Sequence, residues 1–177
     1  MNAQHLTRER AKREIQELSL PEFFIDLFRG ERTLRELGIA APEQIFALKK
    51  VTRSYHLIPL FEYQNETYCC EEHPEGKRFI AFNLDDFDKT TVFGRSFQCL
   101  LAALFIEFWQ DERNDVILPM LAEALEFDYF DELVHEIGDA NKLPTAQYFE
   151  WRRRFCAGCA ENEIALWQQA PKLPAVA

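Results

Sequence analysis

The chain has 177 residues, 47% of them apolar, and this length and composition suit one ordinary domain with a buried core. Thirty acids against twenty bases give a net charge of -10, so we expect no nucleic-acid partner. No apolar run approaches the ~20 residues of a membrane span, and the polar start lacks the apolar centre of a secretion signal, so we expect no membrane contact and a cytoplasmic location.

The N-terminal third of the sequence is predicted to be helical. Residues 5–18 are mostly charged with a few large apolar groups, which predicts a helix lying on the surface. A second helix should follow, with Ser19 as its N-cap, Pro21 in its first turn and Gly30 at its end. The segment 33–53 is predicted to add further helix.

Three short segments rich in aromatic and β-branched residues come next, at 55–63, 67–70 and 78–84. Polar turns separate them, and connections this short favour antiparallel neighbours. After a further polar turn at 88–90, Ser96 can cap a dense apolar helix that should be covered on most sides.

The remaining sequence has helical patterns at 116–127, 129–137 and 144–167. The clearest break between them is predicted at 138–141, and the tail 171–177 is expected to be disordered.

These patterns predict an α+β protein with a small antiparallel sheet packed by helices and a helical C-terminal extension. The extension either packs on the core or forms a small separate lobe, and we expect the first. The expected parts are an N-terminal surface helix at 1–18, an α+β core at 19–110, an acidic helical extension at 111–170 and the tail at 171–177.

The acidity of the chain is regional. Residues 111–143 contain ten acids and two bases, a net charge of -8. An acidic surface suits capture of a basic protein, because opposite potentials steer the encounter; the alternative is that these acids only keep the protein soluble. The candidate partner-binding residues are Asp85, Asp86, Asp88, Glu123, Glu126, Asp128, Asp131 and Glu132. The basic run 152–154 could pair internally with the acidic region.

Groups that could carry chemistry are few. Cys156 and Cys159 have the spacing of a redox or metal pair, but no second Cys or His pair is near enough in sequence to complete a zinc site. Cys69 and Cys70 should point to opposite faces of a strand. The sequence contains no phosphate-binding glycine loop and no nucleophile elbow. We therefore expect no enzyme, metal or cofactor, with a thiol- or metal-dependent enzyme as an alternative.

Three local patterns, in the same order, resemble those of one protein family. Residues 19–28 begin with Leu-Pro and continue with an apolar stripe, residues 56–61 contain Ile-Pro in a strand, and residues 96–101 begin a late helix with Ser-Phe. Across 19–110 the chain resembles the SUKH superfamily, which comprises bacterial immunity proteins, yeast regulators of cell-wall synthesis and the Syd protein.

This resemblance implies a non-catalytic scaffold that binds a protein partner and, in bacteria, often neutralises a toxin. Many toxins act on nucleic acid and so expose cationic surfaces, which an acidic inhibitor can cover. We therefore expect a protein partner with the character of a cationic toxin domain. The alternative is a regulatory or assembly module that uses an exposed aromatic patch at Trp151 or Trp167.

Overall fold

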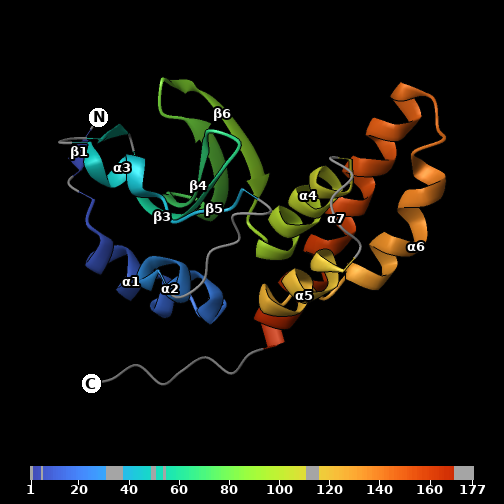
Figure 1. Ribbon diagram of the computed structural model, residues 1–177, viewed down its shortest axis with the longest axis horizontal. Helices are drawn as coiled ribbons and strands as arrows, with labels where there is room; N and C mark the ends of the chain where they lie inside the picture. The colour runs from blue at the N-terminus through green and yellow to red at the C-terminus, as the bar shows by residue number, and fades with distance from the viewer. Residues whose placement is uncertain are drawn as a thin grey trace.

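The computed structural model describes residues 2–4, 6–30, 38–48, 51–53, 55–110 and 116–169. The helices and strands in this part of the chain, in order, are β1 (Asn2–Gln4), α1 (Arg8–Glu17), α2 (Glu22–Arg29), α3 (Glu43–Ala47), β2 (Val51–Arg53), β3 (His56–Tyr63), β4 (Glu66–His73), β5 (Gly76–Asn83), β6 (Asp86–Gly94), α4 (Phe97–Gln110), α5 (Ile117–Ala124), α6 (Phe130–Ala140) and α7 (Thr145–Gln169). An antiparallel sheet with helices around it and further helices after it confirms the predicted α+β class (Figure 1). Among the described helices, none combines the length and the apolar character needed to cross a bilayer.

The main sheet is an antiparallel meander in the order β3-β4-β5-β6, so each strand pairs with its neighbour in sequence. Gln64 and Asn65 form the turn between β3 and β4, and both have positive φ (48° and 64°), which matches a tight turn to the twist of the strands. The three predicted strands are confirmed as β3, β4 and β5, and β4 extends further than predicted, to His73.

The fourth strand, β6, corrects the turn predicted at 88–90. Thr90 and Thr91 pair with Phe82 and Ala81 of β5, so this segment is extended and the turn lies earlier, at 84–85. The polar residues at 88–91 suit an edge strand, and pairing with β5 fixes the extended backbone of this segment although its local sequence is typical of a turn.

Both faces of the sheet are buried. On one face α1, α2 and α4 cover the main core, where the ring of Phe24 stacks on that of Phe61 with centroids 5.8 Å apart. A smaller core on the other face consists of Leu6, Ile45, Leu57, Cys69, Ile80 and Phe82. Cys69 and Cys70 lie in different cores, which confirms that they point to opposite faces.

Helices α1 and α2 confirm the two helices predicted at the start of the chain, but residues 2–4 of the expected surface helix form β1 instead. Ser19 is not the N-cap of α2: it follows α1 with φ 53°, and its N–H donates to the carbonyl of Gln16 at 3.0 Å, which closes the end of α1. Pro21 takes the cap position instead. Gly30 ends α2 in a left-handed conformation with φ 74°, as predicted.

The prediction of helix over 33–53 is right only for α3. Residues 51–53 form β2, which pairs antiparallel with β1 in a separate two-stranded sheet. Pairing with a strand distant in sequence imposes the extended form, and local patterns do not reveal such pairing. Residues 33–37 and 49–50 of the predicted helical region lie outside the described residues.

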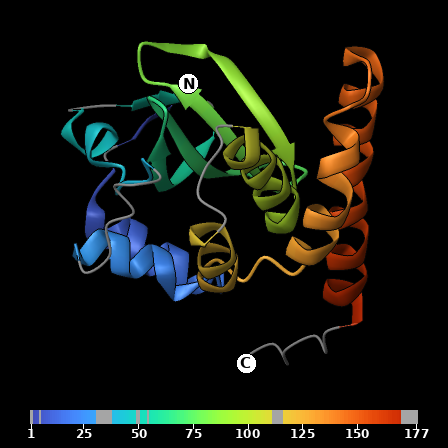
Figure 2. The same cartoon turned by 45° about the vertical axis from the view of Figure 1, so that its right-hand side comes forward.

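The apolar helix α4 occupies the centre of the protein. The Oγ of Ser96 accepts the backbone N–H of Cys99 at 3.0 Å, which confirms the predicted cap. Eleven of the fourteen residues of α4 are buried. This burial follows from its position, because α4 lies between the sheet and α7 (Figure 2).

The helical reading of the C-terminal region is confirmed by α5, α6 and α7, but the predicted break at 138–141 is misplaced. α6 continues through Gly138, because Ile137 and Ala140 are buried and anchor its last turn. The chain turns at 141–144 and then enters α7. The tail 171–177, predicted to be disordered, lies outside the described residues.

Candidate partner-binding surface

Five of the predicted partner-binding acids lie together where α5 leads into α6, and we call this surface the acidic corner: Glu123, Glu126, Asp128, Asp131 and Glu132. All five residues are exposed. Within the described residues, no basic side chain forms an ion pair with any of them.

Gln98 of α4 fixes the backbone of the acidic corner. Its side-chain nitrogen donates to the carbonyl of Glu126 at 2.7 Å, and its side-chain oxygen accepts the N–H of Asp128 at 3.1 Å. Between these two bonds, the ring of Phe127 stacks on Phe105 with centroids 4.9 Å apart. Gln98 is only 9% exposed and belongs to the buried helix α4. Its two hydrogen bonds therefore tie the connection between α5 and α6 to the core.

The acids of the acidic corner have different surroundings from the acids further along α6. The corner's two acids in the first turn of α6 lie at the positive end of the helix dipole, which favours carboxylates. The acids further along have partners: Glu136 accepts a hydrogen bond from Trp151 Nε1 at 2.8 Å, and Asp139 accepts one from Lys142 Nζ at 2.7 Å. The bond from Lys142 also lowers the pKa of Asp139.

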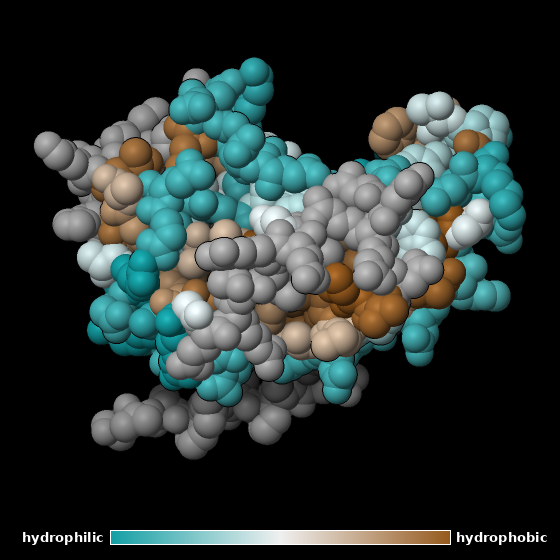
Figure 3. All heavy atoms as spheres, viewed as in Figure 1, coloured by the Kyte–Doolittle hydropathy of each residue, from teal (hydrophilic) through white to brown (hydrophobic). Residues whose placement is uncertain are grey.

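An apolar strip on α5 adjoins the acidic corner. Val116 and Met120 are 68% and 67% exposed and lie four residues apart, so they share one side of the helix, and Glu123 follows Met120 by one turn. Figure 3 shows apolar atoms over α5 in this view. An apolar centre with a charged rim is the usual anatomy of a surface that binds another protein.

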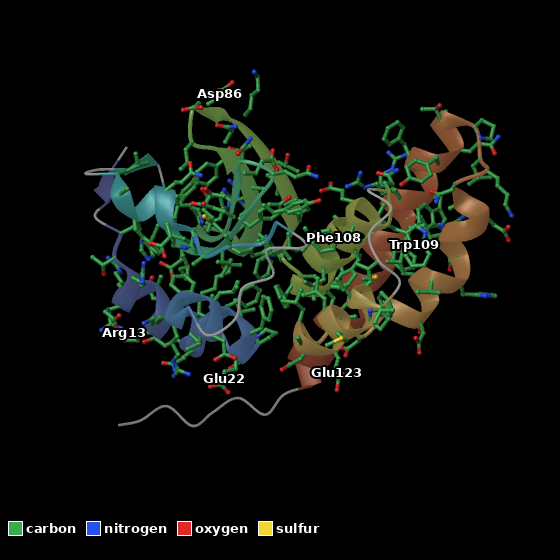
Figure 4. The ribbon with its side chains drawn as sticks, viewed as in Figure 1. Arg13, Glu22, Asp86, Phe108, Trp109 and Glu123 are labelled. Carbon is green, nitrogen blue, oxygen red and sulfur yellow. The ribbon has the colours of Figure 1, made fainter. Side chains whose placement is uncertain are left out.

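The remaining predicted acids are elsewhere. Asp85 and Asp86 lie at the turn between β5 and β6, where Asp85 N–H donates to Asn83 Oδ1 at 2.8 Å and Lys89 pairs with Asp86 at 2.8 Å. Figure 4 places Asp86 at the top of the sheet and Glu123 at the opposite, lower side of the molecule. The structure therefore does not bring these acids together with the acidic corner. The side chain of Asp88 lies outside the described part of the chain.

A polar contact between α4 and α7 was not predicted from the sequence. Arg152 pairs with Glu107 at 2.7 Å, and Gln110 Nε2 donates to the hydroxyl of Tyr148 at 2.8 Å. Arg152 of the basic run therefore pairs with α4, and Arg153 pairs with Glu150 of α7 itself, so within the described residues the run forms no ion pair with the acidic region. The four-residue spacing of Tyr148 and Arg152 places them on one face of a helix. Nothing in the local sequence indicates that this face contacts α4.

An open hollow of about 860 Å³ borders this contact, and it is lined by Trp109, Gln110, Asn141, Leu143, Thr145, Tyr148, Phe149 and Arg152. Trp151 of the expected aromatic patch is buried, whereas Phe149, which lines the hollow, is 57% exposed. The side chain of Trp167 lies outside the described residues.

The two thiols of the predicted pair, Cys156 and Cys159, differ in burial. Cys159 is buried, and burial raises its pKa to about 12, whereas Cys156 is partly exposed, and its interaction with Cys99 lowers its pKa. Among the described residues, no group of three or more His, Cys, Asp or Glu side chains converges in a way that could hold a metal ion.

Comparison of the chain with protein-family models, with curated proteins and with solved structures found no match. The assignment of a function therefore depends on the residues and surfaces described above.

Proposed function

We propose that the protein is a non-catalytic domain that captures a basic protein partner through the acidic corner. The observation that carries this proposal is the grouping of five exposed carboxylates with no ionic partner among the described residues. Like charges held close together repel one another, whereas a cationic partner converts this repulsion into attraction.

The way the acidic corner is held supports recognition. The hydrogen bonds from Gln98 and the stacking of Phe127 fix the backbone that carries the acids, so little order has to be imposed on binding. The exposed side chains of Val116 and Met120 supply an apolar contact beside the charges.

The partner we propose is a cationic toxin domain, which makes this chain an immunity protein that neutralises the toxin by covering its basic surface. The sequence patterns that resemble the SUKH superfamily support this more specific role. A regulatory or assembly role is the second candidate, and the exposed Phe149 beside the hollow favours it. In that case Phe149→Ser would abolish self-association measured by sedimentation, while reversal of the acidic corner would not.

The test is charge reversal with a matched control. The corner variant carries Asp128→Lys, Asp131→Lys and Glu132→Lys, and the control variant has the same change in net charge on α1, α2 and β4, through Glu17→Lys, Glu22→Lys and Glu72→Lys. All of these side chains are exposed, and far-UV circular dichroism checks that both variants fold.

Each protein is used as bait in the native lysate at low and at high salt, and the retained proteins are identified by mass spectrometry. The expected result is one basic protein that the wild type and the control retain, that salt releases, and that the corner variant binds at least about tenfold more weakly. Equal retention by the corner variant would remove the acidic corner from the interface. A retained partner that is not basic would contradict the proposed mode of capture.

A further inference from the structure

The hollow of about 860 Å³ lies where the end of α4 meets the start of α7. The two helices lie side by side (Figure 2), and the residues of α7 that line the hollow share one face of that helix by their spacing. These residues are Thr145, Tyr148, Phe149 and Arg152. The volume falls within the roughly 300–1,000 Å³ of small-molecule sites. The hollow is therefore large enough for a ligand, and its lining decides which kind of ligand fits.

The apolar part of the lining consists mainly of aromatic rings. Trp109 comes from the end of α4, Leu143 from the turn before α7, and Tyr148 and Phe149 from α7, with the last two ring centroids 5.8 Å apart. Leu143 and Phe149 are 38% and 57% exposed, so apolar surface faces solvent here. A planar apolar ring that enters the hollow would remove this surface from water and gain contacts with the rings.

The polar part of the lining has hydrogen-bond donors with unused capacity. Arg152 is the one charged residue among the described residues that line the hollow. Its guanidinium has five N–H donors, and within the described residues one acceptor, Glu107, binds to it, at 2.7 Å. The hydroxyl of Tyr148 accepts a hydrogen bond from Gln110 at 2.8 Å, and no described residue accepts its own proton. Burial raises the pKa of Tyr148, so this hydroxyl remains a donor at neutral pH.

Both donors are held in place by α4. Glu107 anchors the guanidinium of Arg152 and Gln110 anchors the hydroxyl of Tyr148, one helical turn apart on α7. Donors that are already fixed need little ordering when a ligand binds. A carboxylate suits them best, because it only accepts hydrogen bonds and carries the charge opposite to that of Arg152. The net charge of -10 opposes anions in general, but charges more than about 8 Å away are largely screened at physiological salt.

We propose that the hollow is a binding site for a small carboxylic acid that carries an aromatic ring. The carboxylate accepts hydrogen bonds from Arg152 and Tyr148, while the ring packs among Trp109, Leu143 and Phe149. This site is separate from the acidic corner, because the hollow adjoins the end of α6 and the corner lies at its start. Binding of the acid therefore does not depend on capture of a protein partner.

The test is an NMR titration of the isotope-labelled, full-length protein at about 0.15 M salt, with phenylacetate as the probe. Three matched compounds are titrated in the same way: phenylacetamide has the same shape without the charge, phenethylamine has the opposite charge, and acetate lacks the ring. Phenylacetate is expected to bind with a Kd of roughly 1 mM, as a compound of its size should, and to shift the amide resonances of the lining residues. The three other compounds should bind at least about tenfold more weakly.

Two variants test the role of the charge. Arg152→Gln should weaken the binding of phenylacetate at least about tenfold. The matched control is Arg153→Gln, which removes the same charge one residue further along α7, where Arg153 is exposed, pairs with Glu150 and does not line the hollow. This control should bind phenylacetate as the wild type does. Far-UV circular dichroism checks that both variants fold.

Several results would overturn the proposal. Equal affinity for phenylacetate and phenylacetamide would show that the charge is not recognised, and shifts confined to residues outside the hollow would place the ligand elsewhere. No shift up to about 10 mM would exclude the site. A wild type that sediments as a dimer, and that Phe149→Ser converts to a monomer, would show that a second copy fills the hollow instead. The four compounds are compared on the wild type, so the question is decided even where Arg152→Gln fails to fold.

Discussion

Replacing Trp151 by Phe tests how α6 is held on α7. Trp151 is 5% exposed, its ring lies 5.6 Å from that of Tyr148 and 5.7 Å from that of Phe155, and its indole N–H donates to Glu136 at 2.8 Å. A hydrogen bond to a charged acceptor contributes at least about 1.5 kcal/mol to stability. We use this lower value because Glu136 is exposed to solvent. The smaller ring leaves space worth about 1 kcal/mol more. Trp151→Phe should therefore lower the free energy of unfolding by about 2.5 kcal/mol and Tm by roughly 5–10 °C.

The assay is urea unfolding followed by far-UV circular dichroism, and a double-mutant cycle with Glu136→Ala isolates the hydrogen bond. The expected coupling energy is about 1 kcal/mol, because the second mutation costs little once the indole N–H is absent. If the two losses add to within about 0.3 kcal/mol, the bond between these side chains does not stabilise the contact and the reasoning fails.

Three further outcomes follow from single positions. Burial, and then the charge of Glu107, raise the pKa of Glu66, so its contribution to stability is present below its ordinary pKa of 4.5 and is lost as pH rises through the folded value. Glu66→Gln should thus be more stable than the wild type near neutral pH, and unfolding curves in acid should show that this gain disappears. Ser96→Ala removes the cap of α4 and should cost about 1 kcal/mol in urea unfolding; no loss would mean that the bond at 3.0 Å is not a stabilising cap. Gly30→Ala places an alanine at φ 74° with open space around it and should cost about 1 kcal/mol, whereas Gly158→Ala within α7 should stabilise by up to about 1 kcal/mol, and equal effects would refute the role of backbone conformation.

The parts of the fold that the sequence predicts are those whose signal is local. Ser96 followed by apolar residues at helical spacing predicts α4, and the segments that became β3, β4 and β5 contain the aromatic residues of the core. β6 has a weaker signal, because most of the residues in its first two thirds are polar and its form depends on pairing with β5. The pairing of β1 with β2 likewise joins segments that are distant in the sequence, so no local pattern predicts it.

The candidate partner-binding surface is likewise only partly predictable from the sequence. A count of charges along the sequence locates the acidic region, and five of the predicted acids do lie together. The count could not show that Asp85 and Asp86 lie on another side of the molecule (Figure 4). It also could not show the role of Gln98, a single polar residue in an apolar helix, because its two partners lie in the connection between α5 and α6.

The two edges of the meander have a consequence for association between copies of the protein. On the outer side of β3, Pro59 has no N–H to offer, and Glu62 exchanges two backbone hydrogen bonds with Ala40, at 3.0 and 2.9 Å. The pairing of β6 with β5 shifts register twice, and Lys89 places a charge on β6. Neither edge presents a flat, uninterrupted row of donors and acceptors, so the sheet is protected against the strand-to-strand stacking that leads to aggregation.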